Sequence, residues 1–537
     1  MSDTKSDGRA GAAAAAPEPK YDYELIVIGG GPAGEKGAAQ AAYFGHKTVL
    51  IEEYKELGGA CINWGTLASK TLRESSLFLS GFRTRQLGQG LNVEFRADIT
   101  LDSFMYRKNQ VQDAEQKRAR ENLAKPWHKI ERLYGRGTLK DAHTVSLKKP
   151  DGSEQTITGK FILIATGSVP ARPPSLPFND HNVFDSTTVL EMRKVPKSMT
   201  VIGAGVIGSE YASLFQALGV QVTLVHPKGR ALDSLLDAEI GEEFMTRMRA
   251  AGIKPEMNST LASAAVEGDN VRLRLKGKDG AEKEVLTESL LYALGRSGNT
   301  KGLGLEALGI PTAKYGHIEK VDPITYQTTV PNIYAAGDVI GPPALASTSM
   351  EQGRLAMCHA FNIHYKTRLN PILPAGIYTI PEISQVGRTE EDCKREGIPY
   401  VVGKDRYGHH GRGQIIGDTE GMIKLIFAAP SGKLLGVHVI GEIASELVHI
   451  GQACLQFGGD IDFFIHTVFN YPTLSDVYKY AAYHALGKLN QVRDATEKAA
   501  REAVNLAAVT DGKPTDLNQD KPLAASGPVR AMATGAR

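Results

Sequence analysis

The patterned part of the chain opens with a short apolar run that is followed at once by glycines. Residues 24–28 are largely apolar and β-branched, which predicts a buried strand of a parallel sheet. The glycine-rich turn 29–34 comes next, and small and apolar residues over 35–45 predict a helix. A second apolar run, 47–51, predicts another strand that ends at Glu52. This order of strand, turn, helix, strand and acid is typical of a dinucleotide-binding unit.

The same pattern recurs later in the chain. An apolar run at 199–202 leads into the glycine-rich turn 203–208, a helical stretch at 209–218 and a predicted strand at 221–225. Glycines at such turns let the bare backbone approach a pyrophosphate, which the N–H groups at the helix N-terminus then bind. Two such turns in one chain predict two dinucleotide sites.

The two units differ at the position that reads the ribose. Glu52 lies eighteen residues after the last glycine of its turn, and the same count in the second unit reaches His226. A carboxylate there favours the ribose of NAD and repels the extra phosphate of NADP, whereas histidine does not, and Lys228 and Arg230 are nearby cations. We expect the second site to bind NADP(H) well and still accept NAD(H). The alternative is that these basic residues form only a solvated loop.

Composition narrows the functional classes. Hydrophobic residues make up 42% of the 537 positions, which is enough for globular cores. Lys and Arg number 62 against 60 Asp and Glu, so the chain has no net field that recruits nucleic acid or an anionic membrane. No apolar run approaches the ~20 residues that cross a bilayer, and four scattered cysteines do not make a secreted disulfide framework. We therefore expect a cytoplasmic protein that binds small molecules.

Both ends have the composition of tails. Residues 1–20 are rich in alanine, contain acids and hold no aromatic residue, which predicts a disordered leader without a targeting signal. Residues 491–537 are predicted to hold a C-terminal helix and then a second disordered tail over 511–537, where prolines and glycines accumulate. The alternative is that either tail tethers a partner.

A family resemblance enters with residues 57–70, LGGACINWGTLASK, which strongly resemble the redox segment of the flavoprotein disulfide reductases. These enzymes are the FAD-dependent pyridine nucleotide-disulfide oxidoreductases. Four more motifs agree with the family in order: ATG at 165–167, ALGR at 293–296, AAGD at 335–338 and YTIPE at 378–382. The resemblance implies an α/β fold with two Rossmann-like domains, for FAD and for NAD(P), and a C-terminal α+β dimerisation domain.

The resemblance also implies domain boundaries and an assembly. Residues 21–168 would form the first part of the FAD domain, 169–296 the NAD(P) domain, 297–370 the second, central part of the FAD domain and 371–490 the dimerisation domain. The protein would be a homodimer or a higher homo-oligomer. Each protomer would cover the flavin of its neighbour with the segment around Tyr471.

Site residues follow from the same resemblance and from the two turns. FAD is expected at Gly29, Gly31, Gly34, Glu52, Glu53, Gly58, Gly59, Cys61, Thr166, Gly167, Gly337 and Asp338. NAD(H) and NADP(H) are expected at Gly203, Gly205, Gly208, His226, Lys228, Arg230 and Gly295. No residue is assigned to a metal. Lys70 and Glu210 align with an ion pair beside the flavin and the nicotinamide, the alternative being two surface residues that never meet.

Two positions depart from the disulfide reductases. The second cysteine of their redox pair is Thr66 here, and their catalytic histidine is Tyr471. A threonine hydroxyl cannot form a disulfide, and a tyrosine with an ordinary pKa of ~10 is a poor base near neutrality. Because both missing groups serve the same half-reaction, we expect that the dithiol half-reaction is not performed. A distant cysteine that replaces the missing thiol is the alternative.

These departures resemble the transhydrogenase branch of the family, although Asn63 and Ala68 differ from what that branch leads us to expect. The branch implies FAD-dependent hydride transfer between NADPH and NAD, ping-pong through the flavin, with no redox-active disulfide. Alternatives are a dihydrolipoamide dehydrogenase-like enzyme, a quinone reductase, or a catalytically silent flavoprotein with a binding role.

One further motif is the pair His409 and His410, flanked by Arg406 and Arg412. With no acid or cysteine recognised at ligand spacing, we interpret this stretch as an exposed glycine-rich loop and not as a metal or anion site.

Overall fold

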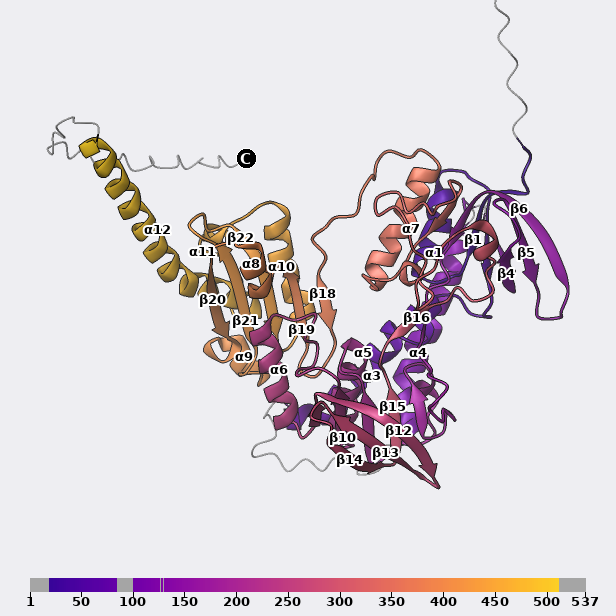
Figure 1. The fold of residues 1–537 in the computed structure, drawn as a ribbon, viewed down its shortest axis with the longest axis horizontal. Helices are drawn as coiled ribbons and strands as arrows, with labels where there is room; N and C mark the ends of the chain where they lie inside the picture. The colour runs from indigo at the N-terminus through magenta and orange to yellow at the C-terminus, as the bar shows by residue number, and fades with distance from the viewer. Residues whose placement is uncertain (1–18, 85–99, 126, 129, 511–537) are drawn as a thin grey trace, which may run out of the picture.

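The computed structural model describes residues 19–84, 100–125, 127–128 and 130–510 (Figure 1). Most of the predicted leader, residues 1–18, and the predicted tail, residues 511–537, lie outside the described residues. The predicted C-terminal helix is the end of α12 (Val477–Thr510).

The first dinucleotide-binding unit forms the centre of a mainly parallel sheet. The parallel strands are ordered β3–β2–β1–β6–β17, and β5 and β4 continue the sheet in antiparallel fashion from the first half of β6. The strands are β1 (Tyr23–Ile28), β2 (Thr48–Glu52), β3 (Ile130–Tyr134), β4 (Arg136–Leu139), β5 (Thr144–Lys148), β6 (Glu154–Ile164) and β17 (Ile333–Ala335). Leu25 and Val27 of β1 pack in the core beneath α1 (Pro32–Tyr43) and α7 (Ala346–Ala360), whereas Ile26 and Ile28 face the opposite core. Both faces of β1 are therefore buried, as its continuous apolar sequence predicts.

The second unit forms a separate parallel sheet in the order β11–β10–β9–β15–β8. Its strands are β8 (Val183–Asp185), β9 (Ser198–Ile202), β10 (Gln221–His226), β11 (Lys254–Met257) and β15 (Ser289–Tyr292), with helices α5 (Val206–Ala217) and α6 (Ala238–Ala250). An antiparallel sheet of β12 (Ser259–Glu267), β13 (Asn270–Gly277) and β14 (Glu282–Thr287) lies beside it. The two chain crossings between the parallel sheets pair as a ribbon, β7 (Ser168–Pro170) with β16 (Arg296–Gly298).

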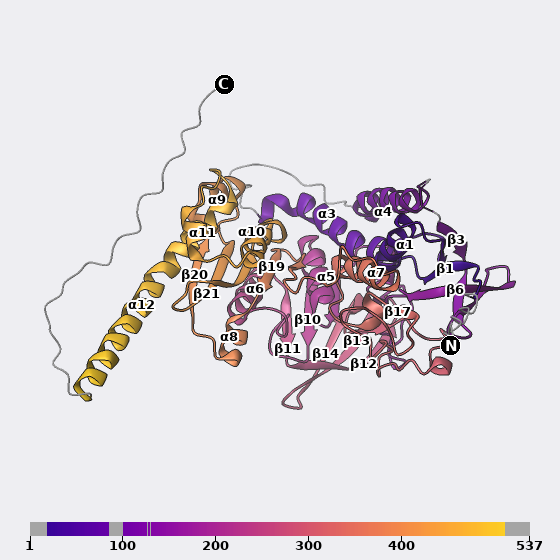
Figure 2. The ribbon, with the colours of Figure 1, turned by 90° about the horizontal axis from the view of Figure 1, so that it is seen from above.

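The C-terminal region is an antiparallel sheet ordered β18–β19–β22–β21–β20 and covered by helices. Its strands are β18 (Ala375–Ile377), β19 (Ile383–Gly387), β20 (Tyr400–Arg406), β21 (Met422–Ala428) and β22 (Leu434–Ile440), and its helices before α12 are α8 (Glu390–Glu396), α9 (Gly411–Ile416), α10 (Ala444–Gln456) and α11 (Ile461–His466). The first four turns of α12 pack in this core through residues such as Tyr478 and Leu489, and the rest of the helix projects away from the sheet (Figures 1 and 2).

Three helices connect the first sheet to the rest of the molecule: α2 (Gly59–Asn63), α3 (Thr66–Thr84) and α4 (Leu101–Leu123). Short 3₁₀ turns lie between the other elements: η1 (Thr188–Glu191), η2 (Glu306–Leu308), η3 (Asp338–Ile340), η4 (Tyr407–His409) and η5 (Leu474–Asp476). Figure 2 shows α3 running from the first sheet toward α10 and β19. Since α3 also packs against α4 and α5, it is the element at which the three regions meet. Within the described residues, no helix combines the length and the apolar character needed to span a membrane.

Candidate active site

The two glycine-rich turns have nearly the same backbone geometry. Gly31 precedes α1 with φ −75° and ψ −173°, and Gly205 precedes α5 with φ −75° and ψ −171°. Among the described residues no side chain caps either helix, so the first N–H groups of both helices are available to an anion. The repeated sequence pattern therefore produces two equivalent anion-binding turns.

The last glycine of each turn allows the helix to pack directly on the turn. A Cβ atom on Gly34 would lie 1.8 Å from the carbonyl oxygen of Gly29, and one on Gly208 would lie 1.7 Å from that of Gly203. A Cβ atom on Gly205, by contrast, would meet no atom of the described residues within 4 Å beyond its own neighbours in the turn, so this glycine faces open space. The turns thus combine one glycine required by packing with one that leaves room for a ligand.

Glu52 and His226 end equivalent strands and make equivalent hydrogen bonds. The Gly30 N–H donates to Glu52 Oε2 at 2.6 Å, and the Ala204 N–H donates to His226 Nδ1 at 3.1 Å. Burial raises the pKa of Glu52 and lowers the pKa of His226. In neutral His226 the second ring nitrogen, Nε2, is an N–H donor. The second site therefore has a neutral hydrogen-bond donor where the first site has the carboxylate of Glu52.

The two predicted phosphate-binding cations behave differently. Lys228 is half exposed and forms an ion pair of 3.1 Å with Asp233. Arg230 instead donates to the backbone carbonyl oxygen of Ala238 at 2.6 Å and holds the loop that leads into α6. Arg230 is therefore bound to its own loop, by a contact that the sequence pattern did not reveal. Lys228 remains as the accessible cation.

Lys70 and Glu210 meet in a partly buried ion pair. The Lys70 ammonium, on α3, lies 2.8 and 2.7 Å from the two carboxylate oxygens of Glu210, on α5. Glu210 also accepts a hydrogen bond of 2.9 Å from the Tyr378 N–H, next to β18, and the Tyr378 ring lies 5.0 Å from the ammonium. The predicted alternative, two surface residues that never meet, is wrong. Lys70, Glu210 and Tyr378, one residue from each of the three regions, therefore meet at the ion pair.

Cys61 faces a hydroxyl and not a second thiol. Burial of the thiol raises the pKa of Cys61, and the neighbouring Thr66 side chain opposes only part of that rise. All four cysteines are free thiols, and the other three, Cys358 on α7, Cys393 on α8 and Cys454 on α10, are buried in other helices.

A cleft of about 1790 Å³ brings most of the predicted site residues together. It is lined by Gly29, Gly31, Glu52, Glu53, Gly59, Cys61, Thr66, Lys70, Thr166, Gly167, Gly205, Glu210, Gly295, Gly337 and Asp338. Its described lining does not include Gly34, Gly58, Gly203, Gly208, His226, Lys228, Arg230 or Tyr471. The glycines among these last residues support the turns, and the polar residues lie at the end of β10 or, for Tyr471, in the C-terminal region.

The wall of the cleft beside the first turn carries polar groups that are already held in place. Ser168 donates to Asp338 Oδ2 at 2.8 Å and accepts a bond of 2.8 Å from Arg296 Nε, so Asp338 is held in place by the ribbon β7–β16. Thr166 Oγ1 is buried with no hydrogen-bond partner in the described part of the chain. An unsatisfied buried hydroxyl requires a partner, and a bound group that presents polar atoms to this wall would supply one. These features fit a long dinucleotide such as FAD.

Two family models match the chain: "Pyridine nucleotide-disulphide oxidoreductase" over residues 23–353 and "Pyridine nucleotide-disulphide oxidoreductase, dimerisation domain" over residues 373–482. The chain belongs to the pyridine nucleotide-disulphide oxidoreductases. It is an FAD-dependent oxidoreductase that uses NAD(H) and NADP(H), and the predicted fold class is confirmed.

Relatives within this family carry a more specific name. A Mycobacterium tuberculosis protein (strain ATCC 25177 / H37Ra) named soluble pyridine nucleotide transhydrogenase is 40% identical over 476 residues, which cover 88% of this chain and 99% of the relative. A Colwellia psychrerythraea protein of the same name is 38% identical and covers 88% of this chain and all of the relative. The Cu(II) complex of the flavoprotein disulfide reductase RclA from Escherichia coli has the same fold, with a TM-score of 0.77, 24% identity and coverage of 86% and 99% of the two chains.

Tyr471, which the family resemblance aligns with the histidine of the disulfide reductases, is exposed in the single protomer. Tyr471 is 76% exposed, and its hydroxyl lies beside Gly411 at the start of α9. It sits within the region matched by the family's dimerisation domain.

The interpretation of His409 and His410 as an exposed loop is wrong for His410. This side chain is buried, and its two ring nitrogens hydrogen-bond Asp405, at the end of β20, and Asp476, in η5. Burial alone would lower the pKa of His410, but the two carboxylates outweigh burial and raise it. Asp405 was overlooked in the sequence, and Asp476 arrives from 66 residues further along the chain.

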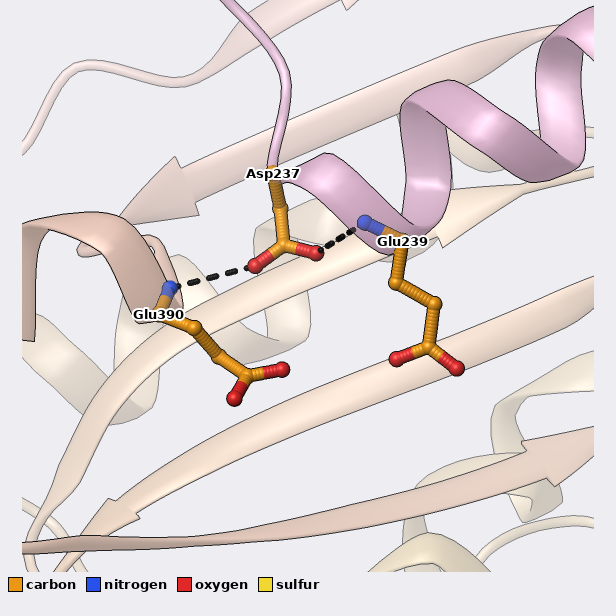
Figure 3. Close-up of side chains that lie close together, drawn as sticks. All are labelled: Asp237, Glu239 and Glu390. Atoms are coloured by element: carbon orange, nitrogen blue, oxygen red, sulfur yellow. Dashed lines mark hydrogen bonds between the residues drawn. The ribbon is translucent and has the colours of Figure 1, made fainter.

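A second cluster outside the cleft involves Asp237, Glu239 and Glu390, whose carboxylates converge (Figure 3). The fully buried ammonium of Lys424 occupies the space between them, 2.7 Å from Asp237 and 3.0 Å from Glu239, and it also pairs with Glu390. Burial alone would lower the pKa of Lys424, but these carboxylates raise it. The cluster therefore holds a cation that belongs to the chain, and it fastens α6 of the second sheet to the C-terminal region.

Proposed function

We propose that the protein transfers hydride between NADPH and NAD without a redox-active disulfide. The observation that carries this proposal is the contact of Cys61 with Thr66 at the redox segment, next to a complete Lys70–Glu210 ion pair. The first feature removes the dithiol half-reaction, because a hydroxyl cannot replace the second sulfur. The second retains the groups of the hydride half-reaction. The relatives named soluble pyridine nucleotide transhydrogenase support the same conclusion.

The chain's own residues bind and orient the reactants. The N-termini of α1 and α5 would hold the two pyrophosphates, and Asp338 and Thr166, which lie beside the first turn, would hydrogen-bond the FAD. When bound, FAD supplies a two-electron carrier that accepts hydride from one nicotinamide and returns it to another. Lys70 and Glu210 need no change of protonation in this scheme; they fix the geometry at the junction of the three regions and exclude water from it.

One dinucleotide site then serves both substrates in turn. NADPH binds at the second turn, leaves as NADP, and is replaced by NAD, which gives ping-pong kinetics. Neutral His226 tolerates either ribose, since its Nε2 N–H can donate to a hydroxyl or to a phosphate oxygen, and Lys228 adds a positive charge for the 2′-phosphate.

The predicted domain boundaries and assembly belong to the same proposal. Residues 21–168 and 297–370 would bind FAD, 169–296 would bind NAD(P), and 371–490 would form the contact of a cytoplasmic homodimer. In that dimer the partner's Tyr471 would cover the flavin, in keeping with its exposure in one protomer.

Turnover with purified holoenzyme tests this function. NADPH and thio-NAD should give reduced thio-NAD, with parallel lines in double-reciprocal plots at several fixed NADPH concentrations. A holoenzyme with bound FAD that gives no turnover would favour the catalytically silent alternative. Turnover with lipoamide in place of NAD would favour a dihydrolipoamide dehydrogenase-like enzyme, and turnover with a quinone would favour a quinone reductase.

A further inference from the structure

Helix α3 carries a second cation, Arg73, one turn beyond Lys70, and this one is buried. Arg73 is 6% exposed, and its Nε donates to the backbone carbonyl oxygen of Thr379 at 3.0 Å. One terminal nitrogen of its guanidinium lies 3.9 Å from the buried carboxylate of Glu382 and also pairs with Glu74. Arg73 thus binds both ends of the short segment 379–382, which belongs to the C-terminal region.

The segment 378–382 is held between α3 and α5 by alternating contacts. The Tyr378 N–H donates to Glu210 on α5, the Thr379 carbonyl accepts from Arg73 on α3, and the Ile380 N–H donates to Ser213 on α5 at 3.1 Å. Ser213 is one turn beyond Glu210 on the same helix. The backbone of this segment therefore aligns the helix that carries Lys70 with the helix that carries Glu210.

Arg73 is also the cation that faces Glu382. This carboxylate accepts bonds from the Ser445 N–H and hydroxyl, at 3.3 and 3.2 Å, at the start of α10. Burial raises the pKa of Glu382, and Arg73 opposes that rise. Without the guanidinium, a buried carboxylate would lose its charged partner, which is strongly unfavourable. The position of the segment and the charge of Glu382 therefore depend on the same side chain.

We propose that Arg73 is a positioning residue for the hydride site. It holds segment 378–382 against α3, so that the Tyr378 N–H fixes one oxygen of Glu210 while both oxygens remain on the Lys70 ammonium. The inference rests on the proposed function, because it gives the Lys70–Glu210 pair a role in hydride transfer. Arg73 contacts the pair only through the segment, and its effect is on geometry.

The rate of hydride transfer is sensitive to such positioning. A displacement of about 1 Å from a remote substitution can slow a reaction about 10²-fold. Loss of the Arg73 contacts frees the segment on the α3 side and lets the Tyr378 N–H move with it. Glu210 would then lose a fixed hydrogen bond, while the dinucleotide turn at 203–208 keeps its geometry. The effect should therefore fall on the rate and not on the affinity for NADPH.

The test is anaerobic stopped-flow reduction of the FAD-loaded holoenzyme by NADPH. In Arg73→Met the limiting rate of flavin reduction should fall at least about tenfold, with the half-saturating NADPH concentration changed less than about threefold. Arg73→Lys keeps a cation toward Glu382 and should recover most of the rate. Ser213→Ala removes the contact with Ile380 without changing charge, and it should also slow reduction.

Arg247→Met is the matched control. Arg247, on α6, also crosses to the C-terminal region, where it donates to the backbone carbonyl of Glu420, and it pairs with Glu243. These contacts lie away from segment 378–382, so flavin reduction should keep its normal limiting rate. An unchanged rate in Arg73→Met, or an equal loss in Arg247→Met, would overturn the proposal.

If Arg73→Met does not yield holoenzyme, Ser213→Ala decides, and an unchanged rate in that variant overturns the proposal. Failure of the proposed function is distinguishable from these results. Wild-type flavin that NADPH does not reduce, or that does not pass its electrons to NAD, counts against the function. Normal wild-type behaviour with unaffected variants counts against Arg73 alone.

Discussion

The hydroxyl of Thr66 lies beside the thiol of Cys61 at the junction of α2 and α3, close enough to oppose part of the rise that burial causes in the pKa of Cys61. In this arrangement a cysteine is held opposite a group that cannot be oxidised with it. The raised pKa of Cys61 further disfavours the thiolate, which is the reactive form. We therefore expect this segment to take part in no dithiol chemistry.

Replacing Thr66 with cysteine should restore a disulfide. The Thr66→Cys variant has five cysteines, of which Cys61 and the new residue would be bonded after purification in air. The unfolded variant should therefore react as a protein with three free thiols before reduction and five after it, whereas the wild type has four in both states. Thiol titration in denaturant measures this.

Thr66→Ser is the control, and it should keep four free thiols. The cysteine variant should still not reduce external disulfides, because the chain has Tyr471 where the resemblance places the acid–base histidine of the disulfide reductases. Five free thiols in the air-purified cysteine variant would contradict the geometry at Cys61.

Replacing His226 with glutamate should change the choice of dinucleotide. The new carboxylate can still accept the Ala204 N–H, as Glu52 accepts that of Gly30, but it would repel the 2′-phosphate. We expect the KM for NADPH to rise at least about tenfold, which corresponds to about 1.4 kcal/mol, and the KM for NADH to change much less. Steady-state kinetics with each dinucleotide checks this.

The neighbouring cations serve as controls for that experiment. Lys228→Met should weaken NADPH selectively but less strongly, since Lys228 is half exposed and already paired with Asp233. Arg230→Met should lower stability without a selective effect on NADPH, because the guanidinium holds its own loop. Equal losses for NADH and NADPH in His226→Glu would show that this position does not read the ribose.

What the sequence could predict was local. Each turn is recognisable because the glycine at its sixth position is required by close contact with the glycine at its first, as between Gly208 and Gly203. The contact of Lys70 with Glu210 came from the family resemblance, since 140 residues separate them. Arg73 was missed, although its spacing of three from Lys70 places both on one face of a helix.

Contacts between regions could not be predicted in the same way. The direction of the Arg230 side chain depends on carbonyl groups of the following loop, and the burial of His410 depends on Asp476 from a distant turn. Lys424 lies in a strand, and the carboxylates that pair with it come from the start of α6 and from α8. Each of these positions is set by the packing of whole elements, which leaves no periodic signal in the sequence.

The His410 contacts should make stability depend on pH. Since the folded pKa of His410 is raised above its ordinary value, its stabilising effect is full below about pH 6.5 and is lost as pH rises through the folded pKa. His410→Gln should therefore lower the free energy of unfolding more at about pH 6 than at about pH 9. Denaturant unfolding of both proteins at the two pH values measures the difference, and an equal loss at both would contradict a charged His410.

Removal of the buried Lys424 cation should be strongly destabilising. Lys424→Met leaves the buried Asp237 and the partly buried Glu390 without their counter-charge, and we expect a loss of about 3–5 kcal/mol in the free energy of unfolding. Lys433→Met breaks an exposed pair with Asp460 and should cost less than about 1 kcal/mol. Similar small losses in both variants, measured by urea unfolding, would contradict the role of Lys424 as a fastening between regions.

Anaerobic titration of the wild-type holoenzyme with NADPH tests the central claim most directly. If electrons are carried by FAD alone, each flavin should take up one pair of electrons and the absorbance change should end there. Uptake of two electron pairs for each flavin would show that a disulfide is reduced together with the flavin, and it would contradict hydride transfer through the flavin alone.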